Sequence, residues 1–261
     1  MEFRNTYDDA AYAEAYAKLE FPGTYYLAYR DLPAILAEHV RGRRALDFGC
    51  GTGRSTRFLR QLGFEAVGVD ISADMVSHAR AADPAGDYRL LPDGDLGALP
   101  RGACDVALAV FTFDNIPAER KPGILGGLAV LLAAGGRLVF VVSSPDIYTH
   151  EWASFSSRDF PENRAAKPGD VVRCVNTAIA DARPADDVLC TDAGYRDALA
   201  AAGLELVATY RPLARGDEPI AWVNETTIAP WVIYVARPRE GATAGPTSHS
   251  ERVYGIYDIS A

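Results

Sequence analysis

The sequence of 261 residues contains no long hydrophobic run. A helix that crosses a bilayer needs about 20 consecutive apolar residues, and no stretch comes near that length. The first ten residues include Glu2, Arg4, Asp8 and Asp9 and lack the apolar core of a secretory signal peptide. These two absences predict a cytoplasmic protein that makes no use of a membrane.

Cysteine is scarce and scattered. The four cysteines form no C-x-x-C pair and have no cluster of histidines beside them; they are Cys50, Cys104, Cys174 and Cys190. Structural zinc sites and disulfide frameworks both require closely patterned cysteines. We therefore expect no metal site and no disulfide network, and we interpret the thiols as buried or inert.

Positive charge is in deficit, because 26 Lys and Arg residues stand against 35 Asp and Glu residues, for a formal net charge of -9. Broad contact with nucleic acid needs clustered basic residues that displace counterions from phosphates. The charge balance therefore points away from nucleic acid and leaves a small molecule as the expected partner. A monomer and a homodimer both stay open.

Apolar runs and helical patterns alternate along residues 41–240. The segments with strand character are residues 44–48, 66–70, 88–91, 105–110, 137–142, 204–210 and 227–236. The segments with helical character are residues 54–62, 72–82, 121–132 and 195–202. Ser72 is a good helix N-cap, and Gly135-Gly136 is a good helix end. This alternation predicts an α/β fold with a doubly wound, mostly parallel, seven-stranded sheet.

Three regions depart from the alternation. Residues 1–40 are rich in Ala, Tyr and Glu and are interrupted at Phe21-Pro22-Gly23, which predicts an N-terminal helical lid. Residues 143–190 are polar, contain several prolines and show no regular pattern, so we expect a loop-rich cap inserted after the fifth strand. Residues 241–261 form a tail that is rich in Gly, Pro and Ser over its first half.

A glycine-rich turn, Asp47-Phe48-Gly49-Cys50-Gly51-Thr52-Gly53, follows the first predicted strand and precedes a helix. Glycines at such a turn let a ligand lie directly against backbone N–H groups. A dinucleotide fingerprint needs a glycine at its sixth position. Counting from Gly49 and from Gly51 gives Arg54 and Thr56 instead. The spacing therefore disfavours a ligand that is held by its pyrophosphate.

Carboxylates stand at the ends of successive strands. Asp47 would repel a phosphate but attract an ammonium group, and Asp70 can accept hydrogen bonds from both hydroxyls of a ribose. Asp95, in the loop of residues 93–100, can accept from an adenine amino group, with Asp93 as the alternative for that role. Together these acids predict a phosphate-free, positively charged nucleoside as the ligand.

With these motifs, the chain resembles the class I (Rossmann-like) S-adenosylmethionine-dependent methyltransferases. Four blocks match in order, at residues 45–56, 67–75, 94–100 with 105–106, and 131–142, and residues 195–207 fit the elements that follow the cap. The resemblance implies S-adenosylmethionine as the cofactor, S-adenosylhomocysteine as the product and a methyltransferase activity.

The resemblance also implies the residues that contact the cofactor. At its methionine end these are Asp47, Gly49, Gly51 and Gly53, with Arg30 as a partner for the carboxylate and Phe111 closing over the ligand. At its nucleoside end these are Asp70, Ile71, Met75, Asp95 and Leu96. Arg30 is as well explained without a cofactor contact, and Met75 and Leu96 as well explained as core residues.

Candidate acceptor-binding residues follow the fourth and fifth predicted strands, where open α/β sheets bind ligands. After the fourth strand, Phe113 and Asn115 are candidates for contact with the acceptor and Asp114 is a candidate catalytic group. Asp114 and Asn115 are equally explained as caps of the following helix.

After the fifth predicted strand, His150 is the candidate general base, because an imidazole titrates near neutral pH. Tyr148 is a second candidate catalytic residue, and Trp152 is a candidate aromatic wall for the substrate. All three are also explained as packing residues of the cap.

The sequence predicts methyl transfer to an oxygen or nitrogen of a small-molecule acceptor. No N-P-P-Y-type tetrapeptide, which would resemble amide and base-amine methyltransferases, follows the fourth strand. An enzyme that cyclises, cleaves or rearranges with the same cofactor stays open, and so does a cofactor-sensing protein without activity.

Overall fold

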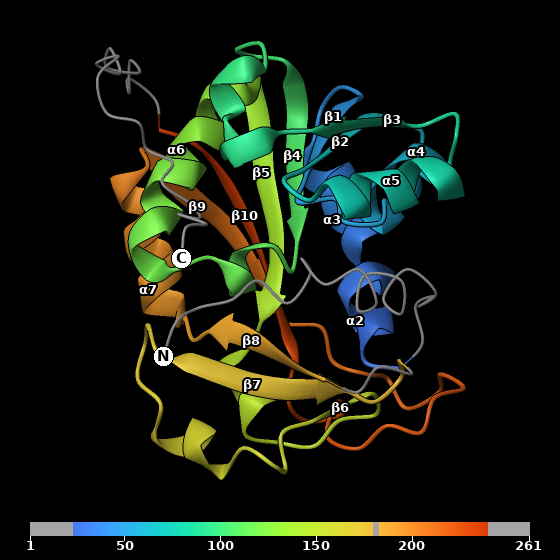
Figure 1. Cartoon of the computed structure of the whole chain (residues 1–261), viewed down its shortest axis with the longest axis vertical. Coiled ribbons are helices and arrows are strands. Elements are labelled where there is room, and N and C mark those ends of the chain that lie inside the picture. Colours follow the sequence, from blue (N-terminus) through green and yellow to red (C-terminus); the bar gives the residue numbers. More distant parts are fainter. Residues whose placement is uncertain (1–22, 180–182, 240–261) are drawn as a thin grey trace, which may run out of the picture.

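A computed structural model describes residues 23–179 and 183–239, and its main feature is a seven-stranded sheet. The strand order is β3-β2-β1-β4-β5-β10-β9. Six of the strands run parallel and β10 runs antiparallel between β5 and β9 (Figure 1). The strands are β1 (Arg44–Phe48), β2 (Glu65–Asp70), β3 (Asp87–Leu90), β4 (Cys104–Val110), β5 (Leu132–Ser143), β9 (Leu204–Tyr210) and β10 (Trp231–Pro238). The predicted α/β fold and its sheet are confirmed.

The central strands are buried on both faces, as their continuous apolar runs require. In β4, Val106 and Leu108 enter one core cluster while Ala107 and Ala109 enter the other. This division follows from the alternation of side chains along a strand. The sheet therefore has two hydrophobic faces, and each needs a layer of helices.

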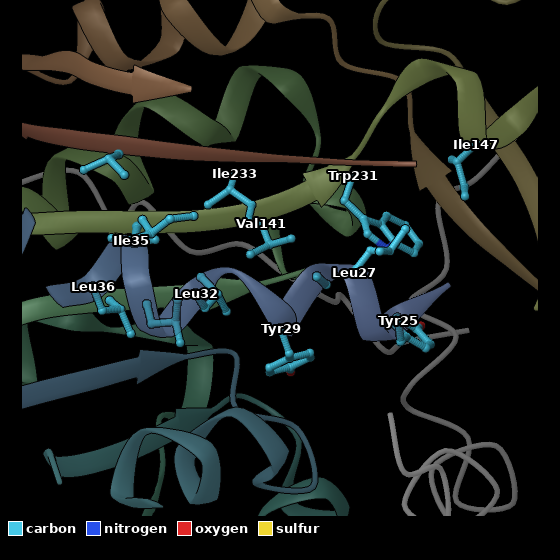
Figure 2. Close-up of a cluster of buried hydrophobic side chains, with 14 of the residues drawn as sticks. Tyr25, Leu27, Tyr29, Leu32, Ile35, Leu36, Val141, Ile147, Trp231 and Ile233 are labelled. Carbon is cyan, nitrogen blue, oxygen red and sulfur yellow. The ribbon is translucent and has the colours of Figure 1, made fainter. Parts of the chain in front are cut away.

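Helices cover both faces. The first core cluster contains residues of α2 (Tyr25–Arg30), α3 (Leu32–His39) and α4 (Arg54–Gln61). Figure 2 shows α2 and α3 lying across the sheet beside Val141 of β5 and Ile233 of β10. The second contains residues of α6 (Lys121–Leu131) and α7 (Asp192–Ala201), whereas α5 (Ala73–Ala82) packs on β3 through a smaller cluster. Within the described residues, no helix is both long and apolar enough to cross a membrane.

Of three element boundaries predicted from the sequence, the structure confirms one and contradicts two. Ser72 caps α5, and its hydroxyl accepts from the Met75 N–H at 3.3 Å. Gly135-Gly136 does not end a helix: α6 ends at Leu131, and the glycines lie in a register shift within β5. The last strand begins at Trp231 and not at residue 227, because Thr227 is held in a turn by the Asn224 carbonyl.

The cap is more regular than its sequence predicts. It contains a three-stranded antiparallel sheet, β6 (Phe155–Ser156), β7 (Val171–Asn176) and β8 (Pro184–Val188), and the short 3-10 helices η6 (Pro145–Tyr148) and η7 (Pro161–Ala165). The sequence did not reveal this sheet, because β8 begins with a proline and contains two aspartates, which are rare in strands. Between these elements the segment is irregular, as expected. Figure 1 shows this sheet beyond the end of β5.

Side-chain hydrogen bonds join the cap to the beginning of α2. The Thr24 N–H donates to Ser154 Oγ at 3.0 Å, and the Trp231 indole donates to the Thr24 carbonyl at 2.7 Å. Glu225 Oε1 accepts from the Thr24 hydroxyl at 2.8 Å and from the Ala153 N–H at 2.7 Å. Much of the predicted lid, residues 1–22, and the predicted tail, residues 241–261, lie outside the described residues. The proposed domain boundaries therefore stay predictions.

Candidate functional site

The glycine-rich turn joins β1 to α4, and its three glycines have different neighbours. Gly49, Gly51 and Gly53 all have positive φ angles, of 70°, 52° and 81°. A Cβ on Gly49 would lie 2.4 Å from Thr112, and one on Gly53 would lie 2.6 Å from Tyr88. A Cβ on Gly51 would meet no atom of residues 23–179 and 183–239 within 4 Å. Packing therefore explains two of the glycines, whereas Gly51 presents its backbone to open space that a ligand can fill.

Asp47 lies beneath this turn and is completely buried. Its Oδ2 accepts from Ser55 Oγ at 2.7 Å and from Thr56 Oγ1 at 2.6 Å, but Oδ1 has no partner among the described residues. Burial raises the pKa of this carboxyl to about 6, and the charge of Asp70 acts in the same direction. A buried carboxylate oxygen without a donor is a favourable place for a cationic ligand group.

Asp70 ends β2 and holds the turn in place. Its Oδ2 accepts from the Gly51 N–H at 2.8 Å, and its Oδ1 accepts from the Ser72 N–H at 2.9 Å. These bonds tie the tip of β2 to the turn, so the carboxylate helps to set the path of the turn.

The residues expected around an adenine divide between surface and core. Ile71 is 41% exposed, and Asp95 is exposed and caps the 3-10 helix Leu96–Ala98 by accepting from the Gly97 N–H at 2.8 Å. Met75 and Leu96 are buried, and Leu96 packs against α6. Their burial agrees with the interpretation as core residues. The side chain of Asp93 lies outside the described part of the structure.

Phe111 and Arg30 lie at the two ends of α2: the Phe111 ring contacts Tyr25 at its start, and Arg30 is its last residue. Phe111 directly follows β4 with a φ of 62°, a strained conformation for a non-glycine residue. The guanidinium of Arg30 donates to Asp31 at 2.8 Å, to Glu218 at 3.0 Å and to the Leu213 carbonyl at 2.9 Å. These partners direct Arg30 toward the segment before β10.

A pocket opens at the carboxyl ends of β4 and β5, under the cap. Its aromatic lining residues, which we call the aromatic wall, are Tyr25, Phe111, Phe155 and Trp231. Its polar lining residues, which we call the polar side, are Asp114, Asn115, Ser143, Asn176 and Asp187, and Ile147, Cys174 and Ala185 complete the lining. We call this site the acceptor pocket.

The aromatic wall is held together around Trp231. The Tyr25 ring stacks on it with centroids 5.7 Å apart and an interplanar angle of 12°, and the rings of Phe111 and Phe155 meet it edge-on at 4.6 and 5.4 Å. Figure 2 shows Tyr25 and Trp231 at the end of the helical layer nearest Ile147. Rings packed against one another in this way form a rigid apolar surface.

The polar side contains two buried carboxyl groups. Asp114 accepts from the Ser143 N–H at 3.1 Å and from the Ser143 hydroxyl at 3.0 Å. Asp187 accepts from Asn115 Nδ2 at 2.7 Å and from the Tyr148 hydroxyl at 3.0 Å. Burial raises the pKa of Asp114 well above its usual value, and the charge of Asp187 adds to this; burial raises the pKa of Asp187 to about 6.

Lys121 lies behind this pair and is 1% exposed. In the described part of the chain its Nζ donates to the Ile116 carbonyl and forms no ion pair with either acid. Burial lowers the pKa of this ammonium, while the charges of Cys190, Asp114 and Asp187 oppose the shift. The acids of the pocket therefore have a cation nearby but no bonded counter-ion of their own.

The candidates after β4 and β5 occupy different places. Asp114 and Asn115 line the acceptor pocket, and Tyr148 stands behind it, bonded to Asp187. Phe113 is fully buried in the core against Phe48 and Phe140, so its side chain is not available to an acceptor.

Two cap candidates lie outside the pocket lining. Trp152 is buried in the core, and its indole donates to the Ile147 carbonyl at 3.1 Å. His150 Nδ1 lies 3.2 Å from the Asp146 carbonyl and 3.1 Å from Thr149 Oγ1, within the turn that follows η6. Neither belongs to the pocket lining that contains Asp114 and Asp187. The sequence interpretation missed Tyr25, Asn176, Asp187 and Trp231, none of which belongs to a local motif.

Comparison with known proteins gives one family match. Residues 21–209 match a family model described as a methyltransferase domain. The chain is 34% identical over 114 residues to a malonyl-[acyl-carrier protein] O-methyltransferase of Pectobacterium atrosepticum, which covers 42% of each protein. It is 24% identical over 185 residues to a ubiquinone biosynthesis O-methyltransferase of Burkholderia thailandensis, covering 68% of the chain and 72% of the relative. The first of these two relatives is thus matched over less than half of its own length, and a ubiquinone biosynthesis O-methyltransferase of Burkholderia ambifaria is matched over 50%.

Solved structures share the fold. DesVI of Streptomyces venezuelae superposes with a TM-score of 0.61 at 19% identity, covering 88% of this chain and 99% of DesVI. The CcbJ methyltransferase of Streptomyces caelestis superposes with a TM-score of 0.60 at 20% identity, covering 90% and 98%. At these identities the likeness concerns the fold alone.

Proposed function

The chain belongs to the class I S-adenosylmethionine-dependent methyltransferases, and from this premise we propose that it methylates an oxygen or nitrogen of a small molecule bound in the acceptor pocket. The observation that carries the proposal is the segment of residues 111–115. The hydroxyl of Thr112 donates to the Phe48 carbonyl at 2.9 Å, beside the glycine turn, while Phe111 and Asp114 line the acceptor pocket. A single short segment therefore separates the cofactor site from the pocket.

The residues of the glycine turn fit S-adenosylmethionine. Gly51 offers an open backbone face, and Asp47 Oδ1 is a buried acceptor that lacks a donor within the described residues. Asp70 stands at the tip of β2 beside the turn, and a carboxylate is an acceptor for hydroxyl groups. These three features match an ammonium group and a ribose. The proposed assignments of Ile71 and Asp95 to the adenine complete the nucleoside end.

When bound, S-adenosylmethionine supplies a methyl group on a positively charged sulfur, which is electrophilic without further activation. The work left to the protein is to orient the acceptor, to exclude water and to hold a proton. The aromatic wall would bind and orient the apolar part of the acceptor. Asp187, with a pKa of about 6, is charged at neutral pH and can take a proton from the acceptor.

Cofactor binding tests the first half of the proposal. Asp70→Asn removes the charge but keeps the size of the side chain, and we expect S-adenosylhomocysteine to bind about tenfold or more weakly, since hydrogen bonds to charged groups contribute roughly 1.5–3 kcal/mol. Glu65→Gln, at the exposed opposite end of β2, is the matched control and should bind as the wild type does. Equal calorimetric affinity of all three proteins would refute the assignment of Asp70.

Product analysis tests the second half. The protein, S-adenosylmethionine carrying a labelled methyl group, and a metabolite extract should give S-adenosylhomocysteine and a labelled small molecule. Methylthioadenosine in place of S-adenosylhomocysteine would identify the alternative chemistry, in which the aminobutyryl chain of the cofactor reacts. Label found in no acceptor would contradict methyl transfer.

A further inference from the structure

The two acids of the acceptor pocket form an arrangement that needs a reason. Asp114 is 5% exposed and Asp187 is 7% exposed. The charge of Asp187 makes ionisation of Asp114 less favourable and so raises the pKa of Asp114. Burying carboxylates is costly unless they are paired with a cation. Lys121 gives its hydrogen bond to the Ile116 carbonyl. A cationic group of a ligand bound in the pocket would therefore stabilise these buried carboxylates.

Asn176 provides a second, independent observation. Its Oδ1 accepts from the Ala178 N–H at 2.9 Å, and because a backbone N–H can only donate, this bond fixes the orientation of the amide. Its Nδ2 therefore must be the donor end, and this atom is buried without a partner among the described residues. Asn176 is 5% exposed and lines the acceptor pocket. A ligand with a hydrogen-bond acceptor would satisfy it.

The rest of the lining sets the size and polarity of the ligand. Phe111, Phe155 and Trp231 contribute apolar surface to the same lining as the acids. No Lys or Arg side chain belongs to the pocket lining in the described part of the chain. A carboxylate or phosphate would thus meet the charge of Asp187 and no basic partner, whereas an ammonium group on an apolar body would meet a carboxylate and the aromatic wall.

We propose that the acceptor is a primary or secondary amine that carries a hydrogen-bond acceptor, as an amino alcohol does, with its nitrogen held by Asp187 and its acceptor group by Asn176. This rests on the proposed function, because it names the substrate class of the same site. Asp114 and Tyr148 are positioning residues: Asp114 fixes the end of β5 through Ser143, and Tyr148 fixes the Asp187 carboxylate.

The chemistry balances with these groups. The bound ammonium gives one proton to Asp187, which leaves the nitrogen with a free electron pair and the carboxyl neutral. The amine nitrogen then forms the new N–C bond as the S–C bond breaks, and the electrons of that bond stay on sulfur as a neutral thioether. The methylated ammonium carries the positive charge away, and Asp187 loses its proton to water. No other reactant is needed.

Matched ligands test the proposal without any variant. Phenylethanolamine and phenylethylene glycol differ only in an amino group against a hydroxyl, and aminocyclohexanol and cyclohexanediol form a second pair. With S-adenosylhomocysteine bound, we expect each amine to bind about tenfold or more tightly than its hydroxyl partner by calorimetry or ligand NMR. Equal binding within a pair, or no binding of either amine at millimolar concentration, would overturn the proposal.

Charge variants show which acid is responsible. Asp187→Asn should weaken phenylethanolamine about tenfold and leave phenylethylene glycol within about twofold. Asp186→Asn is the matched control, because Asp186 is adjacent but is paired with Arg173 and does not line the pocket. Asn176→Ala should weaken phenylethanolamine but not phenethylamine, which lacks the hydroxyl. Equal losses for Asp186→Asn and Asp187→Asn, or a loss of both ligands in Asp187→Asn, would refute the assignment.

The readouts separate this proposal from the one on which it rests. If S-adenosylhomocysteine does not bind the wild-type protein, the methyltransferase assignment itself fails. If it binds and the glycol is methylated in preference to the amine, only the amine assignment fails. Methyl transfer to the amine, seen as an N-methyl signal in the product and lost in Asp187→Asn, supports both.

Discussion

The two halves of the site are built in different ways. The cofactor half is local: Asp47 lies near the end of β1, the glycines form the turn that follows, and Asp70 is the last residue of the neighbouring strand. The acceptor half is dispersed: Tyr25 comes from α2, Asn176 and Asp187 from the cap, and Trp231 from the start of β10. A contiguous motif fixes the chemistry of the first half, whereas only tertiary packing assembles the second.

The difference extends to how each half is held. The cofactor half is shaped by backbone conformation, since three positive φ angles set the path of the turn. The acceptor half is shaped by side chains, through stacked rings and through bonds from Asn115 and Tyr148 to a buried carboxylate. We therefore expect the ratio between lost stability and lost ligand affinity to differ between substitutions in the two halves.

The largest effect is expected in the glycine turn. Gly49→Ala places a Cβ 2.4 Å from Thr112 at a φ of 70°, so we expect a loss of roughly 2 kcal/mol or more in stability together with loss of cofactor binding. Gly51→Ala meets no atom of the described residues within 4 Å and should lower stability by only about 1 kcal/mol. Its Cβ should nevertheless weaken S-adenosylmethionine about tenfold, because it fills the open face.

Thermal unfolding and calorimetry of the two variants check this prediction together. The two variants can be compared directly, because both glycines have a positive φ angle and, among the described residues, only Gly49 has a neighbouring side chain where the new Cβ would lie. Unchanged cofactor affinity in Gly51→Ala would mean that the open face is not part of the cofactor site. Equal destabilisation by the two substitutions would mean that the turn, and not its contacts, determines stability.

The local half of the site and most of the sheet could be predicted from the sequence. The central strands were recognisable because both of their faces are buried, which leaves a continuous apolar run, and Ser72 was recognisable because a cap is a short-range hydrogen bond. The helix end predicted at Gly135-Gly136 was wrong, because a glycine pair is compatible both with a helix end and with the register shift in the pairing of β4 and β5.

The acceptor half could not be predicted, for a physical reason. Asp187 occurs beside a second aspartate in a segment without apolar alternation, and its burial depends on bonds from Asn115 and Tyr148, which are distant in sequence. Trp231 stands in the wall because its indole reaches the Thr24 carbonyl. The interpretation favoured residues just after strands, which found Asp114 and Asn115 but also selected Phe113, whose side chain faces the core.

A smaller effect is expected in the aromatic wall. Trp231→Phe removes the hydrogen bond to the Thr24 carbonyl and reduces the ring area on which Tyr25 stacks. The aromatic wall should therefore hold the acceptor less precisely. We expect kcat/KM for methyl transfer to fall about tenfold, while the affinity for S-adenosylhomocysteine stays within about twofold because Trp231 is not part of the glycine turn.

Trp222→Phe is the matched control for this substitution. Trp222 is only partly buried, its indole donates to Glu218 at 3.1 Å, and it does not line the acceptor pocket. It should leave both measurements unchanged. A parallel loss of cofactor affinity in Trp231→Phe would show that the two halves are coupled, most directly through Phe111, whose ring meets Trp231 edge-on.

The smallest effect is expected at His150, and it decides where the general base lies. A general base contributes about 10²–10⁴-fold to a rate, but the imidazole is bound within its own turn, and its side chain is 39% exposed. His150→Gln should therefore change kcat/KM by about twofold or less across neutral pH. A loss of about 10²-fold, with cofactor affinity intact, would instead mean that the cap turns His150 inward when the acceptor binds, and that Asp187 holds the acceptor without taking its proton.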